Sequence, residues 1–126
     1  MNKKLKLGLF GFGVVGQGLY DVLHKTKGIN AEVVRICVKQ HGKERPIPMQ
    51  YFTFEKNDIL NDDSLDVVVE MIDNADEAFE IVSTALKKGK GVVSASKKMI
   101  AEHFEELHEL QLKHNAPFLY EASACG

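Results

Sequence analysis

Three glycines near the N-terminus have the spacing of a turn that holds phosphates. The turn consists of Gly11, Phe12, Gly13, Val14, Val15 and Gly16. In such a G-x-G-x-x-G segment the first glycine permits a tight bend, the second lets the backbone approach a pyrophosphate, and the third lets a helix pack close to a sheet. The start of that helix offers unpaired N–H groups and a positive dipole end to the phosphates. We therefore predict a dinucleotide site; the alternative is a glycine turn that serves packing alone.

The position that distinguishes NAD from NADP carries a base instead of an acid. NAD-preferring sites place Asp or Glu at the end of the second strand, about 20 residues on, where it binds the ribose hydroxyls. Here the strand ends at Val38 and Lys39 follows. A lysine attracts the 2′-phosphate of NADP, so we predict a preference for NADP, or use of both coenzymes, with a solvated loop lysine as the alternative. Lys43, Arg45 and Lys56 are further candidates to reach this phosphate.

A pair of lysines, Lys97 and Lys98, lies where a strand gives way to a helix. The helix dipole disfavours a cation at this end by about 0.3–1 kcal/mol. Their presence therefore favours a functional role for Lys97, while Lys98 is expected to face away. A lysine at this edge can donate a proton or stabilise developing negative charge. The alternative is a helix-start lysine that faces water.

The elements that would position these groups alternate between strand and helix. Short apolar or β-branched stretches predict strands at residues 5–10, 31–38, 51–54, 66–72, 91–96 and 116–122. Helical periodicity covers residues 14–25, the segment between Asn74 and Gly89, and residues 98–114. Strands joined by helices pair in parallel through right-handed crossovers. We predict an α/β domain with a doubly wound parallel sheet of the Rossmann type, whose ligand crevice lies at the carboxyl ends of the strands.

Two of the helices carry more detailed signals. Asn74 is placed to cap the middle helix, with Glu77 in the capping-box position and Gly89 at the end. The last helix is expected to bury Ile100, Phe104, Leu107 and Leu110.

Composition excludes several other classes of protein. The chain has 126 residues, of which 44% are hydrophobic, and a net charge of −2, which suits one domain with a core. It has no basic patch for nucleic acid and no apolar run of about 18 residues that would span a membrane. Cys37 and Cys125 form no metal or redox motif, and Cys37 is expected in the core. We expect a cytoplasmic protein that binds neither nucleic acid nor membrane.

The chain as a whole resembles homoserine dehydrogenase. That family has a strand ending in V-V-E, a helix ending in A-L-x-x-G-K, a strand leading to V-V-[ST]-A-N-K, a helix with an E-L pair, and a strand ending in E-A-x-x-x-G. The matching segments are residues 67–70, 85–90, 92–97, 106–107 and 121–126. The chain departs from the family at Asp73-Asn74, where Gly-Gly is common, and at Ser96, where asparagine is usual.

The resemblance implies a reversible, NAD(P)-dependent reduction of aspartate 4-semialdehyde to homoserine, on the route to threonine, methionine and isoleucine. Lys97 matches the family's lysine and is expected to be catalytic or to polarise the substrate. Further contacts with the cofactor are expected from Ile72, Ser94, Ser96 and Lys97, with Ser96 at the nicotinamide end. A monovalent cation such as sodium is expected on backbone carbonyls, with a plain strand end as the alternative. The matching positions are Glu121, Ala124 and Gly126.

The family's nucleotide-binding domain is followed by a substrate and dimerisation domain, through which members are generally homodimers. Because the sequence stops at Gly126 within a motif, we expect residues 1–126 to be a NAD(P)-binding domain of a longer enzyme, inactive by itself. Two other functions stay open: a non-enzymatic domain that senses NAD(P)(H), and another dehydrogenase of amino-acid biosynthesis. The segments 92–97 and 121–126 favour homoserine dehydrogenase over the second of these.

Overall fold

The computed structural model describes residues 4–11, 18, 20, 30–39 and 48–120. The strands are β1 (Leu5–Phe10), β2 (Ala31–Cys37), β3 (Phe52–Thr53), β4 (Val67–Glu70), β5 (Gly91–Ser94) and β6 (Phe118–Tyr120). The helices are η1 (Met49–Tyr51), α2 (Asn57–Leu60), α3 (Ala75–Lys87) and α4 (Lys97–His114).

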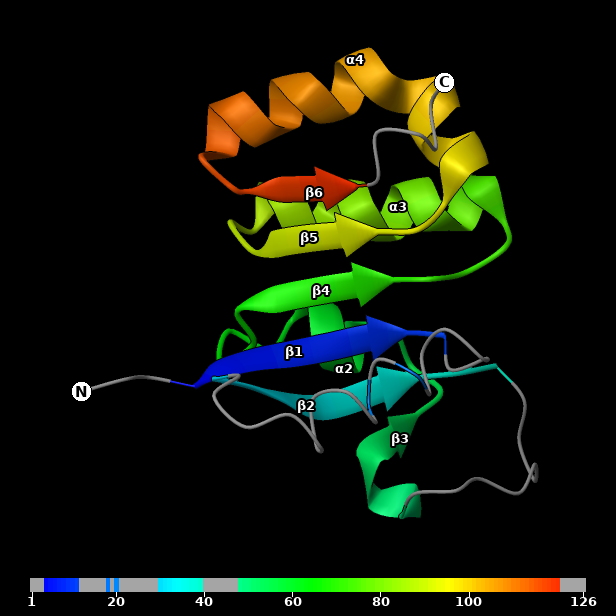
Figure 1. Cartoon of the computed structure of the whole chain (residues 1–126), viewed down its shortest axis with the longest axis vertical. Coiled ribbons are helices and arrows are strands. Elements are labelled where there is room, and N and C mark those ends of the chain that lie inside the picture. Colours follow the sequence, from blue (N-terminus) through cyan, green and yellow to red (C-terminus); the bar gives the residue numbers. More distant parts are fainter. Residues whose placement is uncertain (1–3, 12–17, 19, 21–29, 40–47, 121–126) are drawn as a thin grey trace.

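All six strands pair in parallel, in the order β3-β2-β1-β4-β5-β6 (Figure 1). The chain starts in the middle of the sheet at β1, builds outward to β3, and then crosses to β4 on the other side of β1. The strand order therefore reverses between β1 and β4, which is where doubly wound sheets place their ligand crevice. The predicted α/β fold and parallel sheet are confirmed.

Side chains alternate between the two faces of the sheet, and each face has its own core. Leu9 contributes to the cluster with β2 and β3, whereas its neighbour Phe10 packs with α2, α3 and α4. Gly8 is required on the helical face, because a Cβ there would lie 2.6 Å from a side-chain carbon of Ile59 in α2. This close approach seats α2 directly on β1, behind the strand in Figure 1.

The ends of α3 follow the sequence signals. Asn74 Oδ1 accepts a hydrogen bond from the backbone N–H of Glu77 at 3.0 Å, which satisfies one of the free donors of the first turn. After the helix, Gly89 has φ +79°, a conformation that favours glycine. The cap and the stop fix α3 in register against β4 and β5.

One expectation for α4 is wrong. Ile100 and Leu107 are buried and Leu110 is half-buried, but Phe104 is 43% exposed. His103 has non-helical backbone angles (φ −124°, ψ 23°), so the helical periodicity is interrupted just before Phe104. Met99, which the pattern did not single out, is fully buried instead.

Other differences are small. The short helix α2 was not predicted, and several strands are shorter than their apolar stretches. The expected helix at residues 14–25 lies largely outside the described residues, although Gly18 and Tyr20 have helical backbone. None of the helices in the described part of the chain is long and apolar enough to cross a membrane.

Candidate functional site

The glycine turn begins at the carboxyl end of β1, beside the exit of β4. Gly11 has φ +96°, and a Cβ at this residue would lie 3.0 Å from the carbonyl oxygen of Met71. Its N–H donates to the carbonyl of Cys37 at 2.9 Å, which ties the turn to β2. A side chain is therefore excluded by both conformation and space, as the first glycine of a phosphate-binding turn requires.

Two groups of predicted site residues lie outside the described part of the chain. The first is the rest of the glycine turn, namely Phe12, Gly13, Val14, Val15 and Gly16. The second is the set of predicted cation ligands, Glu121, Ala124 and Gly126. Both sets stay predictions.

The lysine expected to meet the 2′-phosphate has an acidic partner. Lys39 follows β2 at the same edge as Gly11, and its side chain is 71% exposed. Its Nζ lies 2.5 Å from Oε2 of Glu77, in the first turn of α3. Lys56 makes a similar ion pair with Glu80, one turn further along α3. Both described candidates for phosphate binding are thus paired with carboxylates of one helix, while Lys43 and Arg45 lie outside the described residues.

Cys37, the last residue of β2, lies among these charges. Burial first, and then the nearby carboxylates of Glu77, Asp58 and Glu55 in that order, raise the pKa of its thiol from 9.0 to about 11. A thiol with so high a pKa is protonated at neutral pH and is a poor nucleophile. Its half-buried side chain packs against the core, in agreement with the expectation from sequence.

A buried carboxylate joins the ends of β4 and β5. Glu70 is fully buried, and the Ser94 hydroxyl donates to its Oε1 at 2.6 Å. Its Oε2 accepts from the backbone N–H of Ile72 at 2.8 Å and from the Ser96 hydroxyl. Ser96 Oγ also lies 2.9 Å from the Ile72 carbonyl. Glu70 therefore brings together Ile72, Ser94 and Ser96, three of the residues predicted to bind the cofactor.

This network changes how α4 begins. Ser96 is the N-cap residue of α4 but makes no side-chain capping bond, because its hydroxyl is turned to Glu70 and Ile72. Lys97 is the first residue of the helix and is exposed, and among the described residues its ammonium has no hydrogen-bond or ion-pair partner. Lys98 instead lies 3.9 Å from Glu102. Lys97 thus follows the carboxyl end of β5, at the same edge of the sheet as Gly11.

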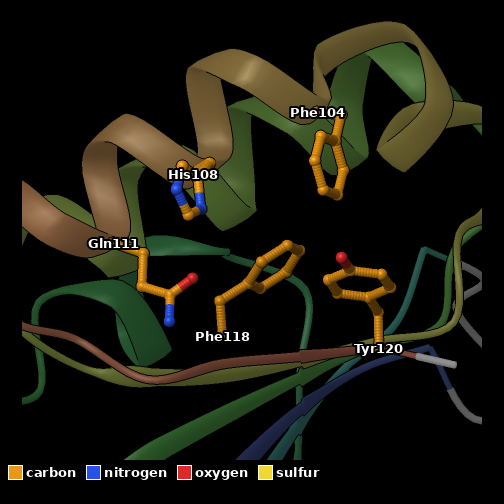
Figure 2. A pocket seen from close by; sticks show the side chains of 5 residues that line it. All are labelled: Phe104, His108, Gln111, Phe118 and Tyr120. Atoms are coloured by element: carbon orange, nitrogen blue, oxygen red, sulfur yellow. The ribbon is translucent and has the colours of Figure 1, made fainter. Parts of the chain in front are cut away.

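Two other groups of polar or aromatic side chains involve α4. Figure 2 shows a small pocket between α4 and β6, lined by Phe104, His108, Gln111, Phe118 and Tyr120. It faces the end strand of the sheet, away from the β1–β4 crevice, and Phe104 closes edge-on to Tyr120 with ring centroids 5.9 Å apart.

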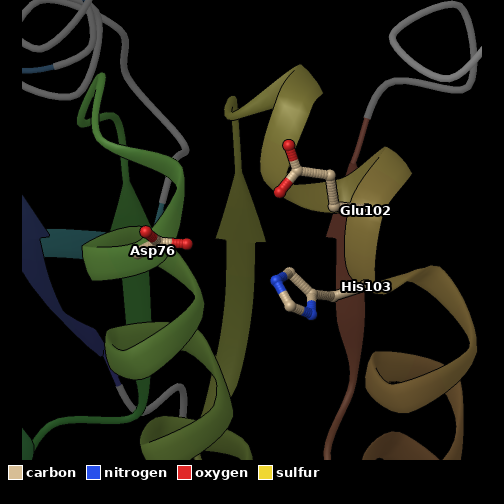
Figure 3. Close-up of side chains that lie close together, drawn as sticks. All are labelled: Asp76, Glu102 and His103. Carbon is tan, nitrogen blue, oxygen red and sulfur yellow. The ribbon is translucent and has the colours of Figure 1, made fainter.

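Figure 3 shows Asp76, Glu102 and His103, whose potential ligand atoms all lie within 4.8 Å of one another. Both carboxylates are exposed, and His103 is engaged elsewhere: its ring stacks on Phe79 at 3.8 Å and its Nδ1 lies 3.0 Å from Glu106. We assign no ion to this group.

Comparison with known proteins identifies the family. Residues 11–121 match the family model described as "Homoserine dehydrogenase, NAD binding domain". The chain belongs to this family. The predicted resemblance is therefore confirmed.

Individual relatives agree. Homoserine dehydrogenase of Helicobacter pylori is 29% identical over 133 residues, which cover 100% of this chain and 31% of that protein. The crystal structure of Staphylococcus aureus homoserine dehydrogenase at pH 6.0 superposes with a TM-score of 0.85 at 33% identity, over 95% of this chain and 33% of that one. A hyperthermophilic archaeal homoserine dehydrogenase in complex with NADPH shares the fold, with a TM-score of 0.77 at 22% identity over 95% of this chain and 44% of that one. The chain thus spans about a third of the length of the first two relatives.

In this homoserine dehydrogenase NAD-binding domain, sequence reasoning missed two acidic residues. The sequence showed Glu70 as the end of an apolar strand but did not mark it as a site residue. A carboxylate at the end of a buried strand does give a signal, because a buried charge needs hydrogen-bond partners. Glu77 was expected only to complete the cap of α3. Its pairing with Lys39 joins residues that are far apart in the sequence, and no local pattern indicates it.

Proposed function

We propose that the chain is the coenzyme-binding part of an enzyme that interconverts aspartate 4-semialdehyde and homoserine with NADP(H) or NAD(H). The observation that carries this proposal is the obligatory glycine turn at Gly11, where the strand order reverses between β1 and β4. The residues fit a dinucleotide: Gly11 has the positive φ that the first glycine of such a turn needs, and Lys39 at the end of β2 offers a cation to a 2′-phosphate.

The chain's own groups would divide the work along this edge. When bound, the nicotinamide supplies or accepts the hydride. Reduction of the aldehyde leaves an alkoxide, and we assign Lys97 the role of stabilising that charge or giving it a proton. Lys97 supports this assignment because it is exposed at the sheet edge and has no ionic or hydrogen-bond partner in the part of the chain that the structure describes. Ile72, Ser94 and Ser96 are proposed near the nicotinamide, with Glu70 as the positioning residue that holds them.

The remaining expectations belong to this proposal as predictions. They are a monovalent cation on the carbonyls of Glu121, Ala124 and Gly126, assembly of the complete enzyme as a homodimer, and a cytoplasmic location. Since the chain spans about a third of its curated relatives, we also predict that residues 1–126 alone bind coenzyme but do not turn over homoserine.

Binding is tested by titrating the chain with NADPH and with NADH and following nicotinamide fluorescence. The variant Gly13→Val places a branched side chain where the backbone must meet the pyrophosphate, so we expect the affinity for both coenzymes to fall about tenfold or more. Gly18→Ala is the matched control, because a Cβ at Gly18 would meet no atom of another described residue within 4 Å. This control should bind as the unmodified chain does and gain up to about 1 kcal/mol of stability.

Two results would contradict the proposal. The first is an unmodified chain that binds neither coenzyme, and the second is a Gly13→Val variant that binds as well as Gly18→Ala. Appreciable oxidation of homoserine by residues 1–126 would leave binding intact but overturn the proposed division of roles between this domain and the rest of the enzyme.

A further inference from the structure

The ion pair at the end of β2 bears on which coenzyme the domain prefers. We infer that Glu77 is a selectivity-determining residue, whose carboxylate competes with the 2′-phosphate for Lys39 and so shifts the preference from NADP(H) toward NAD(H). This inference rests on the proposed function. It adds a residue from α3 to a decision that the sequence pattern assigns to the end of β2 alone.

The geometry holds Glu77 in a fixed place. Its backbone N–H donates to the Asn74 side chain at 3.0 Å, and this cap stabilises the first turn of α3 at the sheet edge. Lys39 is anchored through its neighbour Val38, whose N–H donates to the carbonyl of Thr53 at 2.9 Å. The two side chains meet from these anchored positions, with 2.5 Å between Nζ and Oε2.

The pair is weak enough to exchange partners. The Lys39 side chain is 71% exposed and that of Glu77 is 29% exposed, and exposed ion pairs stabilise a protein by only about 0–1 kcal/mol. A 2′-phosphate can therefore take Lys39 from Glu77. It carries a charge of about −1.5 to −2, however, and would then lie beside a carboxylate that has lost its cation.

The same arrangement favours a ribose with a free hydroxyl. A carboxylate accepts hydrogen bonds only, and the 2′-hydroxyl of NAD is a donor, whereas the 2′-phosphate of NADP offers acceptor oxygens. In NAD-preferring sites an acidic residue lies at the end of the second strand, where this chain has Lys39. Glu77 supplies that acidic group from α3 instead. The Glu80–Lys56 pair one turn along α3 repeats the arrangement, which leaves both described lysine candidates neutralised by a glutamate.

The test compares dissociation constants for NADPH and NADH by fluorescence titration in five forms of the chain. They are the unmodified chain, Glu77→Gln, Glu105→Gln, Lys39→Gln and the double variant Lys39→Gln/Glu77→Gln. Glu77→Gln keeps the side-chain shape and the Asn74 cap, which uses only the backbone of residue 77. It should lower the ratio of the NADPH constant to the NADH constant by about fivefold or more. Glu105→Gln removes an equal charge from an exposed site on α4 and should leave the ratio within about twofold.

The Lys39→Gln background shows whether the effect passes through Lys39. There, Glu77→Gln should change the ratio less than half as much as it does in the unmodified chain. Urea unfolding of each variant verifies that the fold is retained.

The outcomes separate this inference from the proposed function. If the unmodified chain binds neither coenzyme, both fail. If it binds coenzyme but Glu77→Gln leaves the ratio unchanged, or Glu105→Gln shifts it equally, the binding function stands and the role of Glu77 is wrong.

Discussion

At the scale of single residues, the end of β2 places charged side chains next to a half-buried thiol. Lys39, Glu77 and the thiol of Cys37 lie together there, and the pKa of that thiol depends on the charges of both neighbours. Burial is the largest cause of the rise from 9.0 to about 11, and Glu77 is the largest charged contributor. Cys37 therefore offers a local probe of the edge that the coenzyme's ribose is proposed to occupy.

We predict that Cys37 alkylates slowly and that its reactivity depends on Glu77. In a Cys125→Ser background, the rate of reaction with iodoacetamide should rise with a midpoint near pH 11, because the thiolate is the reacting form. Glu77→Gln should move this midpoint to lower pH. An unchanged midpoint in that variant would mean that the carboxylate does not lie beside the thiol.

The same shift predicts a pH dependence of stability. The unfolded thiol loses its proton near pH 9.0, while the folded thiol keeps it up to about pH 11. The contribution of Cys37 to the free energy of unfolding is therefore complete below pH 9.0 and is lost as the pH rises through about 11. Urea unfolding at pH 8 and pH 10.5 should show a larger fall for the unmodified chain than for Cys37→Ala, which lacks the titrating group.

At the scale of elements, the junction of β4, β5 and α4 depends on one buried carboxylate. Glu70 pairs directly with Ser94 across the two strands and also holds Ser96 and the backbone of Ile72. The groups around it are donors. An amide in its place would turn its NH₂ toward at least one of them.

We therefore expect Glu70→Gln to lower the free energy of unfolding by about 1–3 kcal/mol, the cost of leaving a buried polar group unsatisfied. Urea unfolding measures this, with Glu105→Gln as the exposed control that should change stability by less than about 0.5 kcal/mol. Equal stability of the two variants would show that the network does not hold the junction.

The helices and strands were largely predictable from the sequence, whereas the side-chain contacts between them were not. Hydrophobic periodicity and the signals at Asn74 and Gly89 gave the strands, α3 and the fold class, because each depends on residues close together in the sequence. Periodicity failed at Phe104, where the backbone departs from helical angles at His103. It also could not place Glu70 against Ser94, since that contact depends on the register between two strands.

At the scale of the whole molecule, the two faces of the sheet are covered unequally in the described part of the chain. On the side of α3 and α4, Val92 and Phe118 are buried. The next residues along the same two strands, Val93 and Leu119, are register partners and point to the other face, where they are 37% and 63% exposed. Adjacent residues of β6 thus have opposite environments.

This contrast gives a matched test of the packing. Phe118→Ala should lower the free energy of unfolding by about 3–5 kcal/mol, because it opens a cavity under α4. Leu119→Ala should cost less than about 1 kcal/mol, since the side chain is mostly in water and only strand propensity changes. Urea unfolding of both variants decides the point. A large loss for Leu119→Ala with a small one for Phe118→Ala would mean that β6 is turned by one residue, and every assignment of a face at this edge of the sheet would be reversed.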